Sequence, residues 1–241
     1  MANDQFSTGQ LRPVEILKES WELIRPRYWP LLGVTILGIL IASAVPVVLI
    51  GPMMCGIFMM MFRVIDHQKA GFDELFKGFD FIWKSLPVSL LMMAPVVVLI
   101  FVIYLPMIAM MIAGPRMGQT ELLAFLGGWI LFEFVIIFVM VCFHTLLMFA
   151  FPLIADRGLS GLEAVKLSIR AVRANLKGVA GLMGVGALVA IAGYLMLCIG
   201  VYFAIPLILM SQAVAYRRLF PPLTTQANYD PPAPSVYSDL S

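Results

Sequence analysis

The fold class is decided by residues 86–113, which read LPVSLLMMAPVVVLIFVIYLPMIAMMIA and hold no charged side chain. A helix of about 20 apolar residues crosses a hydrocarbon core of about 30 Å, so this run exceeds one crossing. The whole chain has the same character, because 61% of its 241 residues are hydrophobic and 12% are charged. A soluble domain carries about 25% charged residues. The sequence therefore predicts an all-α integral membrane helical bundle.

Further apolar runs on both sides of this segment predict six spans. The predicted spans are residues 28–50, 53–65, 86–113, 122–151, 178–199 and 201–215. Gly51-Pro52 is predicted as the turn between the first two, and the short run 53–65 leaves a re-entrant half-span as an alternative. Residues 1–220 form a single membrane domain in this scheme, and residues 221–241 are expected to be a Pro-rich, disordered cytoplasmic tail.

The basic residues predict the orientation. In the six-span scheme 15 of the 16 Lys and Arg residues fall on one side of the membrane, and Arg116 alone falls on the other. Cytoplasmic loops carry the excess of Lys and Arg. Both termini are therefore expected in the cytoplasm.

An internal repeat relates the two ends of the chain. VEILKESWELIR, from Val14, and LEAVKLSIRAVR, from Leu162, match at a constant offset of 148 positions, with Glu, Lys, Ser and Arg in the same places. A predicted apolar stripe keeps the same register, with a spacing of three and four that is typical of one helix face. It comprises Val14, Leu17, Trp21, Ile24 and Tyr28 in the first copy and Leu162, Val165, Ile169, Val172 and Leu176 in the last.

A weaker third copy places Glu74, Lys77 and Lys84 at the spacing of Glu15, Lys18 and Arg25. The repeat predicts three units, residues 13–66, 72–152 and 161–219. Each unit is expected to be an amphipathic helix in the cytoplasmic interface followed by a two-span hairpin. Anionic lipid headgroups are the expected partners of the basic faces. The predicted lipid-interface residues are Lys18, Trp21, Arg25, Lys166, Arg170 and Arg173.

Two polar residues inside the fourth span are the candidates for chemistry, because charges in a span are costly. Glu133 lies near mid-depth, and His144 follows it by eleven residues on nearly the same helix face. One interpretation is structural, with Glu133 protonated or bonded to Tyr104, Tyr194 or Gln212. The alternative is a proton- or substrate-linked polar path between the spans.

For the acidic residues at the predicted cytoplasmic ends of the spans we expect local ion pairs or helix caps. Asp66 is expected to pair with Arg63, three residues earlier. Asp156 is expected to cap the following helix or to pair with Arg157 or Arg170.

The sequence contains no pattern that predicts an enzyme. It has no phosphate-binding loop of the Walker type, no G-x-S-x-G and no H-E-x-x-H. Its Cys and His residues lack metal-ligand spacing, and its net charge of +2 is too small to indicate nucleic-acid binding. We therefore expect no catalytic residues, no metal, no cofactor and no nucleic-acid partner.

Residues 152–175 read PLIADRGLSGLEAVKLSIRAVRAN and carry Pro152, Asp156, Glu163, Ser168 and Asn175. With Gly51 and Pro52, this pattern resembles a signature of uncharacterised bacterial multi-pass membrane families related to the membrane domain of glycerophosphoryl diester phosphodiesterases. The soluble catalytic domain of those enzymes has no counterpart in the sequence. The resemblance implies a protein of the bacterial inner membrane and no phosphodiesterase activity.

The function expected from these features is that of a membrane scaffold or accessory subunit, interacting with lipid or with other membrane proteins. A transporter or permease, with its path near Glu133 and His144, is the alternative.

Overall fold

The computed structural model of the chain describes residues 6–8, 11–113, 117–196 and 200–222, and every regular element within these ranges is a helix. Arg116, residues 197–199 in the predicted last hairpin, and the tail from residue 223 lie outside the described residues. The elements in chain order are α1 (Pro13–Ile24), η1 (Arg25–Arg27), α2 (Tyr28–Ala44), α3 (Pro46–Ile65), α4 (Asp73–Lys77), η2 (Gly78–Phe81), α5 (Ile82–Ala113), α6 (Gln119–Leu146), α7 (Ala150–Arg157), α8 (Gly161–Ala174), α9 (Leu176–Leu195) and α10 (Gly200–Leu219).

Six helical segments are long and apolar enough to cross a membrane, as the sequence predicts. They are Pro13–Ala44, Pro46–Ile65, Asp73–Ile112, Gln119–Arg157, Leu176–Leu195 and Gly200–Leu219. The first of these includes α1, η1 and α2, and the third includes α4, η2 and most of α5. The chain is therefore a multi-pass membrane protein by the length and composition of its helices.

The prediction of a turn at Gly51-Pro52 is wrong. The chain breaks instead at Val45, which has φ −139° and ψ 80°, and α3 begins at Pro46. Proline suits the first position of a helix because its missing N–H has no intrahelical acceptor there. Gly51 and Pro52 lie buried inside α3, which consequently has 20 residues. The second span, short by the sequence count, therefore has the length of a full crossing.

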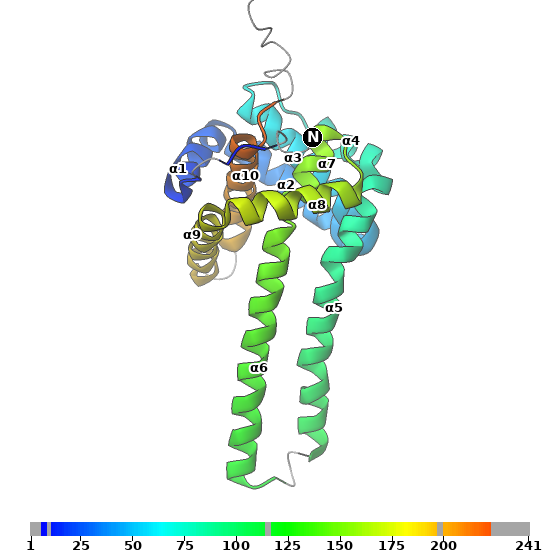
Figure 1. Cartoon of the computed structure of the whole chain (residues 1–241), viewed down its shortest axis with the longest axis vertical. Helices are drawn as coiled ribbons and strands as arrows, with labels where there is room; N and C mark the ends of the chain where they lie inside the picture. The colour runs from blue at the N-terminus through cyan, green and yellow to red at the C-terminus, as the bar shows by residue number, and fades with distance from the viewer. Residues whose placement is uncertain (1–5, 9–10, 114–116, 197–199, 223–241) are drawn as a thin grey trace, which may run out of the picture.

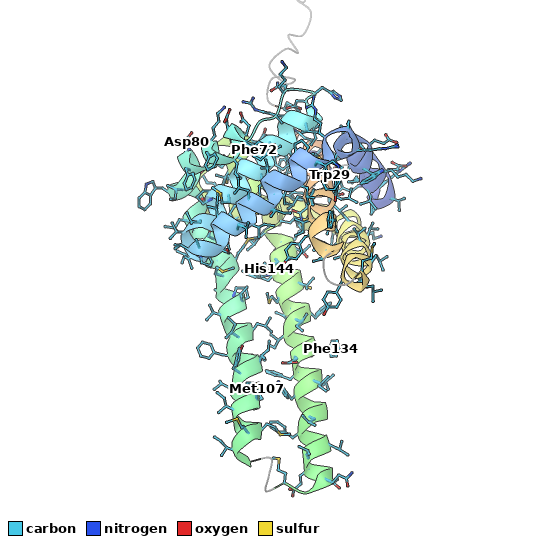
Figure 2. All side chains as sticks on the ribbon, turned by 180° about the vertical axis from the view of Figure 1, so that it is seen from behind. Trp29, Phe72, Asp80, Met107, Phe134 and His144 are labelled. Atoms are coloured by element: carbon cyan, nitrogen blue, oxygen red, sulfur yellow. The ribbon has the colours of Figure 1, made fainter. Side chains whose placement is uncertain are left out.

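The six long helices do not run parallel in one bundle. Figure 1 shows α5 and α6 extending side by side, far beyond a layer that the other helices form. Figure 2 shows α2 running at a steep angle to this pair. The lengths explain the shape, because α5 has 32 residues and spans about 48 Å, whereas α3 has 20 and spans about 30 Å. No residue of α6 is buried, so the outer part of this pair has no cover from the rest of the described chain.

The core lies in the layer, where α3, α7 and α10 meet. Phe62 of α3 and Tyr216 of α10 have ring centroids 5.1 Å apart, and Tyr216 stacks on Phe220 at 4.9 Å. Phe149, which precedes α7, contacts both Tyr216 and Phe220. All of these rings are buried. Segments from the beginning, middle and end of the chain thus share one aromatic core.

The buried faces of α1 and α8 correspond to each other through the repeat. α1 buries Ile16, Ser20 and Ile24. The equivalent positions of α8 at the offset of 148, which are Ala164, Ser168 and Val172, are buried too. Other residues of the predicted stripes are exposed on the helix surface, where Val14 is 57%, Trp21 46% and Leu162 65% exposed. Ser20 and Ser168 each lie at the centre of the buried face of their helix, where the small side chain allows close packing.

The middle copy of the repeat lacks a helix comparable to α1 or α8. α4 has five residues and ends at Lys77, and η2, which begins at Gly78, leads directly into α5. A Cβ atom on Gly78 would lie 2.0 Å from the carbonyl oxygen of Pro52. The backbone here packs directly against α3. This contact explains why an amphipathic helix does not continue through the position.

Replacing Gly56 with Ala should destabilise the protein, because the new Cβ would lie 2.3 Å from the Leu75 carbonyl oxygen. Overpacking of this kind costs about 1–3 kcal/mol. Gly127→Ala is the matched control, since nothing lies within 4 Å of its Cβ position. The measurement is the thermal unfolding midpoint of the full chain in detergent. Equal midpoints for the two variants would contradict the close contact.

Candidate functional site

A polar cluster joins the ends of three helices beside the aromatic core. Arg217 of α10 binds Asp156 of α7 at 2.9 Å and Asp66, which follows α3, at 3.0 Å. Tyr216 donates its hydroxyl hydrogen to Asp156 at 2.7 Å, and the Arg217 guanidinium lies 4.5 Å from the ring centre of Phe62. The side chains of Arg217 and Asp156 are only 14% and 16% exposed. We call these five residues the Arg217 clasp.

The partners predicted for Asp66 and Asp156 are wrong. Asp66 binds Arg217, and Arg63 instead pairs with Glu74 at 3.0 Å. Asp156 also takes Arg217 as its cation rather than Arg157 or Arg170. Glu74 is 4% exposed and accepts a second bond from Lys77 at 2.8 Å. For both aspartates the predicted partner is close in the sequence, whereas the observed partner, Arg217, is brought near only by the tertiary fold.

The other residues of the predicted family pattern in 152–175 mostly make contacts at helix ends. Ser168 donates to the Leu146 carbonyl oxygen at 2.8 Å and accepts the Phe149 N–H at 3.2 Å, which ties α8 to the α6–α7 turn. Glu163 accepts bonds from the hydroxyl and the N–H of Ser160, and the hydroxyl bond chiefly holds the pKa of Glu163 below its usual value. The Asn175 amide donates to the Ala171 carbonyl oxygen at 3.0 Å. Pro152 is buried in α7. These contacts stabilise the fold.

His144 connects α6 to α5 where the pair leaves the layer (Figure 2). Its Nδ1 lies 2.9 Å from the Met140 carbonyl oxygen, and its Nε2 lies 3.2 Å from the carbonyl oxygen of Met92 on α5. A neutral imidazole carries one N–H and can donate only one of these bonds, whereas an imidazolium can donate both. His144 is thus a link between the two helices.

Glu133 is half-buried in the seam between α5 and α6 and has no hydrogen-bond or ion-pair partner among the described residues. The residues predicted to bond it do not, and Tyr104 and Tyr194 are 52% and 64% exposed. Eleven residues separate Glu133 from His144, or about 16 Å along the helix. The structure therefore does not bring these two candidates together.

The seam follows a spacing of three and four on both helices. Half-buried positions of α6 include Trp129, Glu133, Ile136 and Met140, and those of α5 include Met92, Val96, Leu99 and Ile103. This pattern is typical of two helices packed by knobs into holes. The indole N–H of Trp129 is buried without a hydrogen-bond partner, one turn from Glu133.

An apolar cavity of about 440 Å³ lies between α1, α6, α9 and α10. Leu17, Met148, Met183 and Ile208 line it, with Ser211 and Gln212 as its polar residues. Nothing lies within 4 Å of a Cβ built on Gly184, which also lines it. Glu133 and His144 are not among its lining residues. The cavity thus has the chemistry of an apolar ligand site and is separate from both candidates.

A second hollow, of about 700 Å³, opens where Thr8, Leu11 and Arg12 meet the corner between α8 and α9. Arg12, Arg173 and Lys177 line it together with the first turn of α9. We call this hollow the basic groove. It contains one of the predicted lipid-interface residues, Arg173. All six predicted residues, namely Lys18, Trp21, Arg25, Lys166, Arg170 and Arg173, are exposed.

Within the described residues, no group of three His, Cys, Asp or Glu side chains could hold a metal ion. Comparisons of the chain with protein-family models, curated proteins and solved structures found no match. The family resemblance of residues 152–175 accordingly stays a prediction.

Replacing Arg217 with Gln should lower the free energy of unfolding by about 1–3 kcal/mol, because two carboxylates lose their shared cation. Glu15→Gln is the control, since its pair with Arg12 is exposed on both sides and should contribute little. Asp156→Asn should cost less in the Arg217→Gln background than alone, as expected of directly coupled residues. Additive effects in chemical denaturation of the four proteins would contradict the clasp.

Proposed function

We propose that this chain is a non-enzymatic membrane protein, a scaffold or accessory subunit that interacts with lipid and with partner membrane proteins. The observation that carries the proposal is the uncovered α5–α6 pair. No residue of α6 is buried, and large apolar side chains such as Phe134 and Phe138 are each 69% exposed. A path for a polar substrate needs helices that enclose it, whereas this pair offers apolar surface to its surroundings.

The proposed setting is the bacterial inner membrane, with both termini in the cytoplasm. The concentration of Lys and Arg on one side of the six-span scheme supports this orientation. In the same proposal the first and last repeat units each consist of a two-span hairpin, α2–α3 and α9–α10. The amphipathic helices α1 and α8 precede them and lie in the cytoplasmic interface.

Anionic lipid is the proposed partner of α1 and α8. Each helix exposes large apolar side chains beside cations, with Trp21 near Lys18 in α1 and Leu162 near Lys166 in α8. Apolar side chains enter the boundary of the acyl chains while cations meet lipid phosphates.

Transport is the second candidate function, and one observation favours it. Glu133 lies within an apolar span and has no partner among the described residues, and an ionisable group in that position is a functional candidate. A proton-linked transporter would use it as the carrier of the proton.

Anionic lipid should slow amide hydrogen exchange in α1 and α8 when the full chain is reconstituted in bilayers. The physical reason is that headgroup contacts hold both helices in the interface. The comparison is between phosphatidylcholine alone and phosphatidylcholine with phosphatidylglycerol, and α3 serves as the internal control because its core contacts do not change. Equal exchange in both membranes would refute lipid recognition by these helices.

Glu133→Gln should leave the proton permeability of proteoliposomes unchanged, because the scaffold proposal gives this carboxyl group no role in a flux. A pH-sensitive dye inside the vesicles reports the flux, with protein-free vesicles as the baseline. A protein-dependent flux that Glu133→Gln abolishes would favour the transporter instead. His144→Ala serves as the comparison variant on the same helix.

A further inference from the structure

The two corners that the repeat relates differ in how their cations are partnered. In the first unit, Arg27 at the corner between α1 and α2 donates to the carbonyl oxygen of Gln68 at 2.8 Å. In the last unit, Arg173 and Lys177 at the corner between α8 and α9 have no hydrogen-bond or ion-pair partner among the described residues. At the offset of 148, Arg173 corresponds to Arg25, which is likewise exposed without a partner among the described residues, and Lys177 corresponds to Trp29. The α8–α9 corner therefore carries two unpartnered cations where the α1–α2 corner carries one.

The basic groove is held in place by close contacts between the start of the chain and α9. A Cβ on Gly178 would lie 2.6 Å from the Leu11 side chain, and one on Gly181 would lie 2.7 Å from the ring of Pro13. Leu11 is buried. Because both neighbours of Arg12 in the chain pack on α9, Arg12 is fixed beside the corner that carries Arg173 and Lys177.

The charge of the groove favours an anionic ligand. Its described lining includes three cations and no carboxylate, and Glu15 binds Arg12 from an exposed position. The start of α9 adds to the positive potential, because Asn175 turns its amide back to Ala171 and provides no side-chain cap. The first N–H groups of a helix lack intrahelical acceptors and favour negative charge.

The position of the groove at the start of a candidate span favours a membrane lipid as the source of that anion. It lies at Leu176, where a candidate membrane span begins. Leu176 itself is 57% exposed beside the unpartnered cations. An apolar side chain and cations at one level of a membrane helix match the boundary between acyl chains and phosphates.

We propose that the basic groove is a specific site for the phosphate headgroup of one anionic lipid, bound by Arg173, Lys177 and Arg12. The site rests on the proposed function and sharpens it, because it assigns a defined headgroup position to one corner of the protein. The remaining exposed cations then contribute only diffuse attraction.

The test counts lipids bound to the full chain by native mass spectrometry in detergent, with short-chain phosphatidylglycerol as the probe and phosphatidylcholine as the neutral comparison. The groove variant is Arg173→Gln with Lys177→Gln. The matched control is Arg27→Gln with Lys69→Gln, which removes the same charge from exposed positions outside α1 and α8. We expect the groove variant to bind phosphatidylglycerol about tenfold more weakly and the control to stay within about twofold of the unmodified chain.

Four outcomes would contradict the proposal that the basic groove binds the phosphate of one anionic lipid. Equal weakening in both double variants would indicate diffuse charge attraction and leave the proposed lipid interaction intact. Full binding by the groove variant would place the lipid elsewhere. Displacement of the lipid by inorganic phosphate at matched concentration would identify a soluble phosphate as the ligand. No preference of the unmodified chain for phosphatidylglycerol would overturn the groove and the proposed lipid partner together.

Two further variants keep the result independent of folding. Arg173→Lys with Lys177→Arg retains both charges and should retain binding. Arg12→Gln removes the third cation without touching α8 or α9 and should also weaken binding. The unfolding midpoints of all variants should match that of the unmodified chain, because Arg173 and Lys177 are exposed and make no contact that stabilises the fold.

Discussion

The structure depends on direct backbone packing against α3. Lipid tails are as apolar as leucine, so the hydrophobic effect does not drive helices together inside a membrane, and close van der Waals contact must do so. α3 makes this possible with Gly51, whose Cβ position lies 2.3 Å from the Ser85 hydroxyl oxygen, and with Gly56, whose Cβ position lies 2.3 Å from the Leu75 carbonyl oxygen. The α4–η2 segment and the start of α5 therefore pack against α3. Where α3 ends, α5 and α6 continue with only each other as partners, and the uncovered pair of helices follows from that difference in length.

The Arg217 clasp fixes the helices relative to one another at the polar end of the layer. Hydrogen bonds and ion pairs there are directional, so they fix the rotation and the depth of helices that apolar packing alone would leave free to slide. Arg217 places α10 against α3 and α7 at once, since each of its two terminal nitrogens binds a different carboxylate. The aromatic rings beneath the clasp help to bury the Arg217–Asp156 pair and lower the local dielectric, which strengthens that bond, whereas Asp66 is 38% exposed. Asp156 and Ser168, which belong to the predicted family pattern, make contacts that hold helices together in this framework.

Composition and periodicity predict the six apolar helical segments, because whether a segment can cross a membrane depends on the hydrophobicity of its own residues. The repeat was also informative, since the offset of 148 relates Ile16, Ser20 and Ile24 to Ala164, Ser168 and Val172, which are buried in the same way. The predicted apolar stripe does not distinguish residues that pack against other helices from residues such as Trp21 that face outward, because lipid is an acceptable solvent for both kinds of side chain. Gly51-Pro52 resembled a turn because a Gly-Pro pair ends most soluble helices, and the tertiary contact with Ser85 was not visible in the sequence. The partner of Asp66 lies 151 positions away, beyond the range of any local pairing rule.

Comparison of the two units that the offset of 148 relates supports the proposed lipid site. Positions that hold each unit together stay equivalent, as the serines at the centres of α1 and α8 do. The corners differ, because Lys177 stands where the first unit has Trp29, and Arg27, which donates to the Gln68 carbonyl oxygen, stands where the last unit has Asn175. A cation left without an internal acceptor loses nothing while water solvates it, and it gains when a phosphate arrives in a partly dehydrated interface. The proposed lipid site therefore depends on the additional unpartnered cation of the α8–α9 corner, which the basic groove presents where a candidate membrane span begins.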